Sequence, residues 1–393
     1  MATRSARSHL LWQYADREVI RRSIKHDLRG SDGPLDTCDR IPFTFDASCL
    51  STSFHGGGRV DLRKKAAPAY HVNPDQLLFI NGGTSQANHH VVHALTQAGD
   101  VIVVEHPVYD PLTEASRITR CKIETLTRRP EDDFQISGDR LRTILKDHNP
   151  RLIVISNLHN PSCVAVRNME ELLSVLREHN EGKDRPSLLV VDEVYRDLAT
   201  EDIRPAASLS PYAVSTFGLS KSYGLSGLRH GLIIATPQLI DVILGYYTLV
   251  GVCNSSLSES LWTQFYDHRE RVLQENRQRQ RHRQKIVEDA LLQNNIPFTR
   301  SDGGTVILAK LPTDDDVAFS TGMADKYDAS VNPGTNFGLP GYARIGFMNV
   351  SEEAVREGIA AFCKHWKDAC SWCLSPPRVL SSSPVVPATE AYL

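Results

Sequence analysis

The chain has 393 residues, of which 23% are charged, and a formal net charge of −3. This balance gives no reason to expect a nucleic-acid or membrane partner, and no segment approaches the length of a membrane span. The basic N-terminal residues precede no apolar run of the kind that a secretory signal needs. Eight cysteines are scattered through the chain, and Cys370 and Cys373 lack the second pair that would complete a zinc site. We therefore expect reduced thiols, no bound metal, a cytoplasmic location and a chain long enough for a large core.

The first informative segment spans residues 77–87. Its apolar start predicts a buried strand, and two glycines then lead into a helix that we expect to begin near Gln86. Backbone N–H groups at such a helix start, with the hydroxyls of Thr84 and Ser85, can bind a phosphate. Glycine-rich turns between strands and helices are common, so this segment alone does not identify a site.

The next apolar strands also end in residues suited to bind a ligand. Residues 100–109 end in Tyr109, whose ring could stack on a flat cofactor. Residues 151–162 run into Asn160, and the following Pro161 restricts that residue to an extended or turn conformation, which aims its amide. An ordinary Asn-Pro turn is the alternative interpretation.

Residues 188–195 form a third strand of this kind. Its unbroken apolar run is typical of a parallel strand covered on both faces, and ligands in such sheets lie beyond the carboxyl ends of the strands. Asp192 lies at that end, and Tyr195 follows three residues later. The alternative for Asp192 is the N-cap of a helix.

The most informative segment is residues 215–231. Lys221 follows Ser220, and Arg229 follows eight residues after the lysine. A lysine amine can form a Schiff base with an aldehyde, and a forked guanidinium can bind phosphate oxygens. This pair fits pyridoxal 5′-phosphate (PLP). Taken alone, Lys221 could equally be a surface lysine in a glycine-rich loop.

A PLP site would also give roles to the earlier strand ends. A carboxylate against the pyridine nitrogen keeps it protonated, so that the ring can accept electrons, and Asp192 fits this role. The hydroxyl of Tyr195 and the amide of Asn160 could share the phenolic oxygen of the ring.

Taken in order, these motifs resemble those of the class I/II aminotransferases, the fold-type I PLP-dependent enzymes. The resemblance covers roughly residues 40 to 366. It is carried by Gly83-Thr84-Ser85, Pro107-x-Tyr109, Asn157-x-x-Asn160-Pro161, Asp192-x-x-Tyr195, Ser220-Lys221 and Arg229.

The resemblance implies catalytic roles for Lys221, which binds the cofactor and carries protons, for Asp192 and for Tyr195. It further implies that Tyr109 stacks on the ring. The residues that it places around the phosphate are Gly83, Thr84, Ser85, Ser220 and Arg229.

Near the C-terminus, residues 342–347 resemble the family segment in which an arginine binds the substrate α-carboxylate. That residue is Arg344, and a bidentate guanidinium suits a planar carboxylate. Asn160 is implied at the same site, and residues 332–338 resemble the loop that borders the substrate. A strand arginine paired with a surface acid is the alternative.

Three departures from the family pattern bear on function. Gly218 stands where many members have a phosphate-binding serine, and Cys163 where a turn normally ends in glycine. Residues 53–63 resemble the segment that carries a tyrosine to the other subunit's phosphate, but Phe54 or His55 occupies that place. We expect a homodimer with sites near the subunit boundary, and His55 is either a substitute phosphate donor or a solvent-facing loop residue.

The motifs also suggest how the chain is organised. The expected fold is α/β, with a large mostly parallel sheet domain that binds PLP and a smaller α/β C-terminal domain. We expect one long helix, or two in series, over residues 258 to 293, and its seven Arg or Lys against two Glu between residues 269 and 285 indicate a solvated helix better than a nucleic-acid site. The expected divisions are an N-terminal segment packing with the small domain (1–39), the large domain (40–257), the long helix with the small domain (258–372) and a disordered tail (373–393).

Three functions are compatible with these residues. The first is an aminotransferase acting on an amino acid or a metabolite derived from one. The second is a PLP-dependent lyase, substitution enzyme or cyclase on the same fold, which the missing tyrosine and the short N-terminal stretch favour. The third is an inactive binding or regulatory homologue, against which the intact Lys221, Asp192 and Arg344 argue. The sequence does not identify the substrate side chain.

Overall fold

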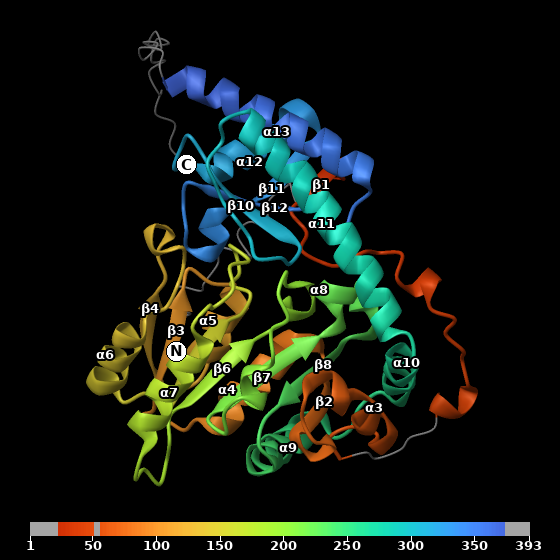
Figure 1. Ribbon diagram of the computed structural model, residues 1–393, viewed down its shortest axis with the longest axis vertical. Helices are drawn as coiled ribbons and strands as arrows, with labels where there is room; N and C mark the ends of the chain where they lie inside the picture. Colours follow the sequence, from red (N-terminus) through yellow and green to blue (C-terminus); the bar gives the residue numbers. More distant parts are fainter. Residues whose placement is uncertain (1–22, 51–55, 374–393) are drawn as a thin grey trace, which may run out of the picture.

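The computed structural model describes residues 23–50 and 56–373, with side chains to residue 370, and its strands form two sheets (Figure 1). The larger sheet has seven strands in the order β2-β8-β7-β6-β5-β3-β4. The five strands from β7 to β4 are parallel, whereas β8 is antiparallel to both of its neighbours. The strands are β2 (Leu77–Asn81), β3 (Val101–His106), β4 (Lys122–Thr127), β5 (Leu152–Ser156), β6 (Leu188–Asp192), β7 (Ala213–Gly218) and β8 (His230–Ile234).

Helices cover both faces of this sheet, which explains the unbroken apolar runs of its central strands. On β6, Val190 packs into the cluster that includes the helices α4 and α9, and Val191 packs into the cluster on the opposite face with α6 and α7. Further helices cover the β2 and β8 end. The helices of this part are α3 (Val60–Tyr70), α4 (Gly83–Leu95), α5 (Asp110–Arg117), α6 (Gly138–His148), α7 (Met169–Asn180), α8 (Leu219–Tyr223), α9 (Pro237–Gly251) and α10 (Ser256–Tyr266).

The smaller sheet has five strands in the order β1-β11-β12-β10-β9. Its first strand comes from the N-terminal segment and runs parallel to β11, so the two ends of the described chain meet in one sheet. Figure 1 shows α11 and α13 packed beside this sheet. The elements are β1 (His26–Leu28), β9 (Phe298–Thr299), β10 (Val306–Lys310), β11 (Ala329–Pro333), β12 (Tyr342–Gly346), α11 (Arg269–Gln293), α12 (Asp316–Tyr327) and α13 (Glu352–Cys373).

The large, mostly parallel sheet and the smaller second sheet agree with the predicted fold class. The helical segment expected from residue 258 is two helices in series, α10 and α11. Basic residues of α11 pair with acids elsewhere, since Arg269 lies 3.0 Å from Asp197 and Arg279 lies 2.6 Å from Asp36. The domain boundaries stay predictions, and the predicted tail lies outside the described residues except for Cys373. None of the described helices combines the length and apolarity needed to cross a bilayer.

Candidate active site

Register brings two predicted strand ends, those of β5 and β6, together with the end of β7 at the carboxyl edge of the large sheet. Ser156 on β5 pairs with Asp192 on β6, and Asp192 pairs with Thr216 on β7. A hollow of about 160 Å³ opens at this edge. Every predicted site residue except Gly83 and Arg344 lines it, and the lining residues are Ser31, Asp32, Thr84, Ser85, Tyr109, Leu112, Ser156, Leu158, Asn160, Asp192, Val194, Tyr195, Ser220, Lys221 and Arg229.

Asp192 is buried beneath this hollow and held by two hydrogen bonds. Its Oδ2 accepts from Nδ2 of Asn88 at 2.8 Å, and its Oδ1 accepts from the backbone N–H of Val194 at 3.1 Å. The Thr216 hydroxyl donates to the Asn88 amide oxygen at 2.6 Å, which fixes the direction of the amide. No α-helix starts at Asp192, so the N-cap alternative is wrong.

Burial raises the pKa of the Asp192 carboxyl to about 6, despite the hydrogen bonds that oppose this shift. Among the described residues, no cation forms an ion pair with Asp192. A buried carboxylate without a cation is costly, and a cationic ligand group would relieve that cost. A protonated pyridine nitrogen is a group of that kind.

Lys221 lies on α8 and lines the same hollow. Its Nζ is 2.9 Å from Oδ1 of Asp32 and 3.1 Å from Oγ of Ser31. Burial lowers the pKa of Lys221, while the neighbouring Asp32 opposes that shift. A lowered amine pKa increases the fraction of neutral lysine, which is the form that attacks an aldehyde.

The residues predicted to bind phosphate gather at the start of α4. This helix begins at Gly83, three residues before the predicted start, so Thr84 and Ser85 lie in its first turn. Gly82 and Gly83 both have positive φ, which glycine adopts easily. Nη2 of Arg229 donates to the Gly82 carbonyl at 3.1 Å. A Cβ atom on Gly83 would lie 3.1 Å from the same Nη2, so the guanidinium packs closely against this glycine.

Both departures in the cofactor turns have a steric explanation. A Cβ atom on Gly218 would lie 2.5 Å from Oγ1 of Thr84, so the threonine hydroxyl occupies the space of a serine side chain. Cys163 has a φ of 54°, in the left-handed region that favours glycine. Its thiol fits because Gly304 has no side chain, since a Cβ there would lie 2.5 Å from the sulfur.

Arg344 lies on β12 next to the lining residue Asn160. Its Nη1 donates to the Asn160 amide oxygen at 3.0 Å, and its Nη2 donates to the Arg29 carbonyl at 3.1 Å. Its guanidinium carbon lies 4.6 Å from the ring centre of Phe337, in the loop predicted to border the substrate. Arg344 is 4% exposed, and its Nε has no hydrogen-bond partner.

This environment excludes the alternative in which Arg344 pairs with a surface acid. The arginine is buried, and within residues 23–50 and 56–373 no carboxylate lies within ion-pair distance of it.

The hydroxyl of Tyr195 also lacks a partner, because it is buried and makes no hydrogen bond of normal geometry. Burial also raises the pKa of Tyr195, so the hydroxyl keeps its proton and can donate it to a ligand oxygen.

Three residues at the site are not predicted from the sequence. Ser31 and Asp32 reach Lys221 from the N-terminal segment, and Asn88 holds Asp192 from the second turn of α4. Asn88 could have been predicted from its position in the sequence, because it lies one helical turn after Thr84 and so on the same face of the helix. The run from Ser31 to Pro34 has turn composition but carries no sign of its partner.

One prediction at the site falls outside the described residues. Phe54 and His55, the expected substitutes for the inter-subunit tyrosine, belong to the segment that the structure does not describe. The adjoining Gly57 lies against the sheet, because a Cβ there would be 3.1 Å from the Leu78 side chain.

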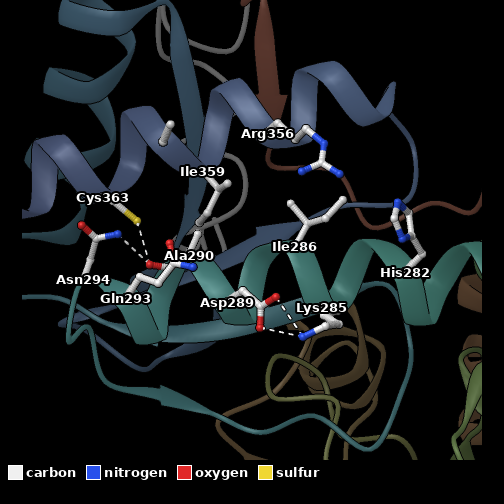
Figure 2. A pocket seen from close by; sticks show the side chains of 11 residues that line it. His282, Lys285, Ile286, Asp289, Ala290, Gln293, Asn294, Arg356, Ile359 and Cys363 are labelled. Atoms are coloured by element: carbon white, nitrogen blue, oxygen red, sulfur yellow. Dashed lines mark hydrogen bonds and ion pairs between the residues drawn. The ribbon is translucent and has the colours of Figure 1, made fainter.

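A larger hollow of about 530 Å³ lies between α11 and α13, away from the strand ends (Figure 2). Figure 2 shows that several of its polar groups are already paired, with Lys285 bound to Asp289 and Asn294 bound to the Ala290 carbonyl. None of the predicted site residues lines it. The smaller hollow at the strand ends is therefore the candidate active site.

The fold and this site together define a PLP-dependent enzyme of fold type I. The family model described as aminotransferase class I and II matches residues 46–362, which is most of the chain. The protein therefore belongs to the class I and II aminotransferase family and is a PLP-dependent enzyme. The resemblance, fold class and cofactor predicted from the sequence are confirmed.

Several curated proteins are similar to this chain. Capreomycidine synthase of Streptomyces vinaceus is 29% identical over 77% of this chain and 78% of its own length. An aromatic aminotransferase of Arabidopsis thaliana is 25% identical over 73% of this chain and 74% of its own. An LL-diaminopimelate aminotransferase of Dehalococcoides mccartyi is 22% identical over 78% of this chain and 81% of its own.

Solved structures support the fold at lower sequence identity. A PLP-dependent aminotransferase from Streptococcus suis superimposes with a TM-score of 0.82 at 20% identity, covering 93% of this chain and 99% of that one. Thermus thermophilus aspartate aminotransferase with maleate gives a TM-score of 0.78 at 18% identity, covering 92% and 97%.

The residues present fit PLP. The unpaired Tyr195 hydroxyl, the buried Asp192 carboxylate and the first turn of α4 provide a donor, an anion and a phosphate-binding helix start around one hollow. Each matches a group of the cofactor: the phenolic oxygen, the pyridine nitrogen and the phosphate.

Proposed function

We propose that this enzyme is an aminotransferase that accepts the amino group of an amino acid, or of a metabolite derived from one, on PLP bound through Lys221. The observation that carries the proposal is the convergence of Lys221 and the buried Asp192 on one hollow, with the buried Arg344 beside it. The family to which the chain belongs supports the same reaction.

The cofactor residues have distinct tasks in this proposal. When bound, PLP supplies an acceptor for the electron pair released at the substrate α-carbon. The Asp192 carboxylate keeps the pyridine nitrogen protonated, and the Tyr195 hydroxyl and Asn160 amide bind the phenolic oxygen. Tyr109 stacks on the ring, and the phosphate is bound by Gly83, Thr84, Ser85, Ser220 and Arg229.

The substrate residues complete the site. Arg344 binds the substrate α-carboxylate, for which its unpaired Nε and its buried position make it suitable. The lowered pKa of Lys221 favours a neutral amine. Its Nζ can then take the proton from the α-carbon and return it to the neighbouring cofactor carbon.

A lyase or cyclase is the second candidate. The curated relative named capreomycidine synthase matches at 29% identity, and Lys221, Asp192 and Arg344 would serve either reaction. Lys221 also lies beside Ser31 and Asp32. The Asp32 carboxyl is an acidic group that simple amino transfer does not require, and it could serve a lyase or cyclase. An inactive regulatory role fits poorly, because the described site retains all three of these residues.

We further propose that the enzyme is a homodimer located in the cytoplasm. Apolar side chains at the end of α9 are exposed, including Leu249, which is 84% exposed, and Val252. This end lies beside the phosphate turn, since Nδ2 of Asn81 donates to the Cys253 carbonyl at 3.0 Å. A second subunit covering these side chains would approach the cofactor phosphate.

Two measurements test the proposed reaction. Borohydride reduction followed by peptide mapping should recover the cofactor on Lys221. In separate, unreduced enzyme, a half-reaction with an amino donor alone should convert the cofactor to its amine form, as seen in the absorbance spectrum. Release of ammonia or a cyclised product, with the lysine-linked cofactor regenerated at each turnover, would favour the second candidate instead.

A further inference from the structure

Asp32 is the carboxylate on the wall of the active-site hollow that the proposed function leaves without a task. Among the described residues, two carboxylates line the hollow, Asp32 and Asp192, and Asp192 is buried. The Asp32 side chain is 39% exposed and faces Lys221 Nζ at 2.9 Å. It therefore lies where a bound substrate would meet it.

The backbone on both sides of Asp32 is held in place. The Ser31 carbonyl accepts from the Thr305 hydroxyl at 2.8 Å, and the Gly33 N–H donates to the Ser220 carbonyl at 3.0 Å. Gly33 approaches so closely that a Cβ there would lie 2.6 Å from the Lys221 carbonyl oxygen. The packing of the N-terminal segment on α8 therefore fixes the backbone at Asp32, and this backbone holds the carboxylate close to Lys221.

The ion pair with Lys221 is interrupted in the cofactor-loaded enzyme that first meets the substrate. The Lys221 amine is used when it links to the cofactor aldehyde, and in the part of the chain that the structure describes no other cation lies within 4 Å of Asp32. The guanidinium of Arg344 donates to Asn160 and the Arg29 carbonyl, and in the proposed function it binds the substrate α-carboxylate. Asp32 is then a carboxylate on the substrate side of the site without a partner of opposite charge.

The substrate can supply that partner. Its α-carboxylate is bound by Arg344 and its α-amino group is engaged by the cofactor, which leaves its side chain to meet Asp32. We infer that Asp32 is a specificity residue that binds a cationic group, an ammonium or a guanidinium, on the substrate side chain. This inference rests on the proposed function and narrows its substrates to basic amino acids and their derivatives.

A basic side chain would also assist the reaction. Once Lys221 is released from the cofactor, Asp32 stabilises its protonated form, which cannot accept the proton from the α-carbon. A cation bound to Asp32 would weaken that effect, because the carboxylate would be neutralised by another partner. The preference for a basic substrate should therefore be found in the rate as well as in the affinity.

Matched substrate pairs test the inference on the PLP-loaded enzyme. L-Arginine is compared with L-citrulline, which has a similar shape without the charge, and L-lysine with Nε-acetyl-L-lysine. Single-turnover rates and affinities are read from the cofactor absorbance. For at least one pair we expect the charged member to be preferred by about tenfold or more, and Asp32→Asn to reduce that preference to about twofold or less.

Two further variants control for indirect effects. Asp32→Glu keeps the charge and should retain part of the preference. Asp36 belongs to the same segment, but its carboxylate pairs with Arg279 and does not line the hollow. Asp36→Asn should therefore leave the preference for the charged substrate unchanged. Equal use of both members of both pairs by the wild type, or an unchanged preference in Asp32→Asn, would overturn the inference.

Failure of the inference can be distinguished from failure of the proposed reaction. Binding of the same four compounds to the PLP-loaded Lys221→Ala variant, read from the cofactor absorbance, reports charge discrimination without the proton transfer and without the lysine cation beside Asp32. A binding preference that depends on Asp32, with no amino transfer from any donor, would sustain the inference and reject the aminotransferase. Amino transfer with no preference for the charged compounds in either assay would support the aminotransferase and reject the inference about Asp32.

Discussion

Gly218 and Thr84 share one space in the phosphate region, because a Cβ atom on Gly218 would lie 2.5 Å from Oγ1 of Thr84. The two residues come from different elements, the end of β7 and the first turn of α4. The hydroxyl that the sequence lacks at position 218 is thus replaced in space by the hydroxyl of Thr84.

This relationship predicts that Gly218→Ser weakens PLP binding instead of adding a donor. The backbone at Gly218 is extended, with φ of −166°, so any residue can adopt it and the penalty comes from the contact with Thr84 alone. We expect a loss of about 1–3 kcal/mol in cofactor affinity, measured by equilibrium titration of the cofactor-free enzyme. Combining Gly218→Ser with Thr84→Ala should recover much of that loss, and additive losses in the double variant would reject the shared space.

A second prediction concerns Asp192→Asn. The amide can keep the hydrogen bond from Asn88 but carries no charge to hold the pyridine nitrogen protonated. The variant should retain the cofactor and lose at least ~100-fold in single-turnover rate. Absorbance of the lysine-linked cofactor verifies loading in the same samples. A variant of near-normal rate would show that the ring does not serve as an electron acceptor.

The strand-end residues could be predicted because local patterns fix them. Asp192 ends one apolar strand and Asn160 lies four residues beyond the end of another, and parallel pairing of these buried strands brings their carboxyl ends to one edge. The predicted start of α4 is three residues too late, because Gly82 and Gly83 resemble a longer turn although Gly83 is already helical.

The acid beside the lysine could not be predicted in the same way. Asp32 lies 189 positions from Lys221 and meets it only because β1 joins the smaller sheet and leads the next residues onto α8. No local pattern encodes a pairing at that separation. The steric replacement of a serine by Thr84 is equally non-local, because it depends on how β7 and α4 approach each other.

A third prediction concerns Arg344→Ala, which removes the receptor for the substrate carboxylate. Truncation of one partner of a buried charge pair costs about 2–5 kcal/mol, so kcat/KM should fall by ~30-fold or more, mostly through KM. The absorbance of the lysine-linked cofactor should be unchanged, because Arg344 does not line the cofactor hollow. Arg344→Lys keeps the charge but loses the bidentate geometry and should be only partly active. A normal KM in Arg344→Ala would remove this arginine from the substrate site.

The last prediction uses the pH dependence of stability in the cofactor-free enzyme. Burial raises the pKa of Asp192 from 3.8 to about 6, so between these values the folded state binds more protons than the unfolded state. The stability contributed by this group is therefore complete below pH 3.8 and is lost as pH rises toward 6, by on the order of 2–3 kcal/mol.

Asp192→Asn removes the titration, and the neighbouring buried Glu193 remains in both proteins, so its effect largely cancels in their difference. Denaturant unfolding at pH 4.5 and 7.5 should show the variant gaining stability over the wild type by roughly 2 kcal/mol between the two conditions. PLP should remove the difference, because its protonated ring nitrogen neutralises the wild-type carboxylate. A difference that is independent of pH would mean that Asp192 ionises normally in the folded enzyme and that its burial does not call for a cationic partner.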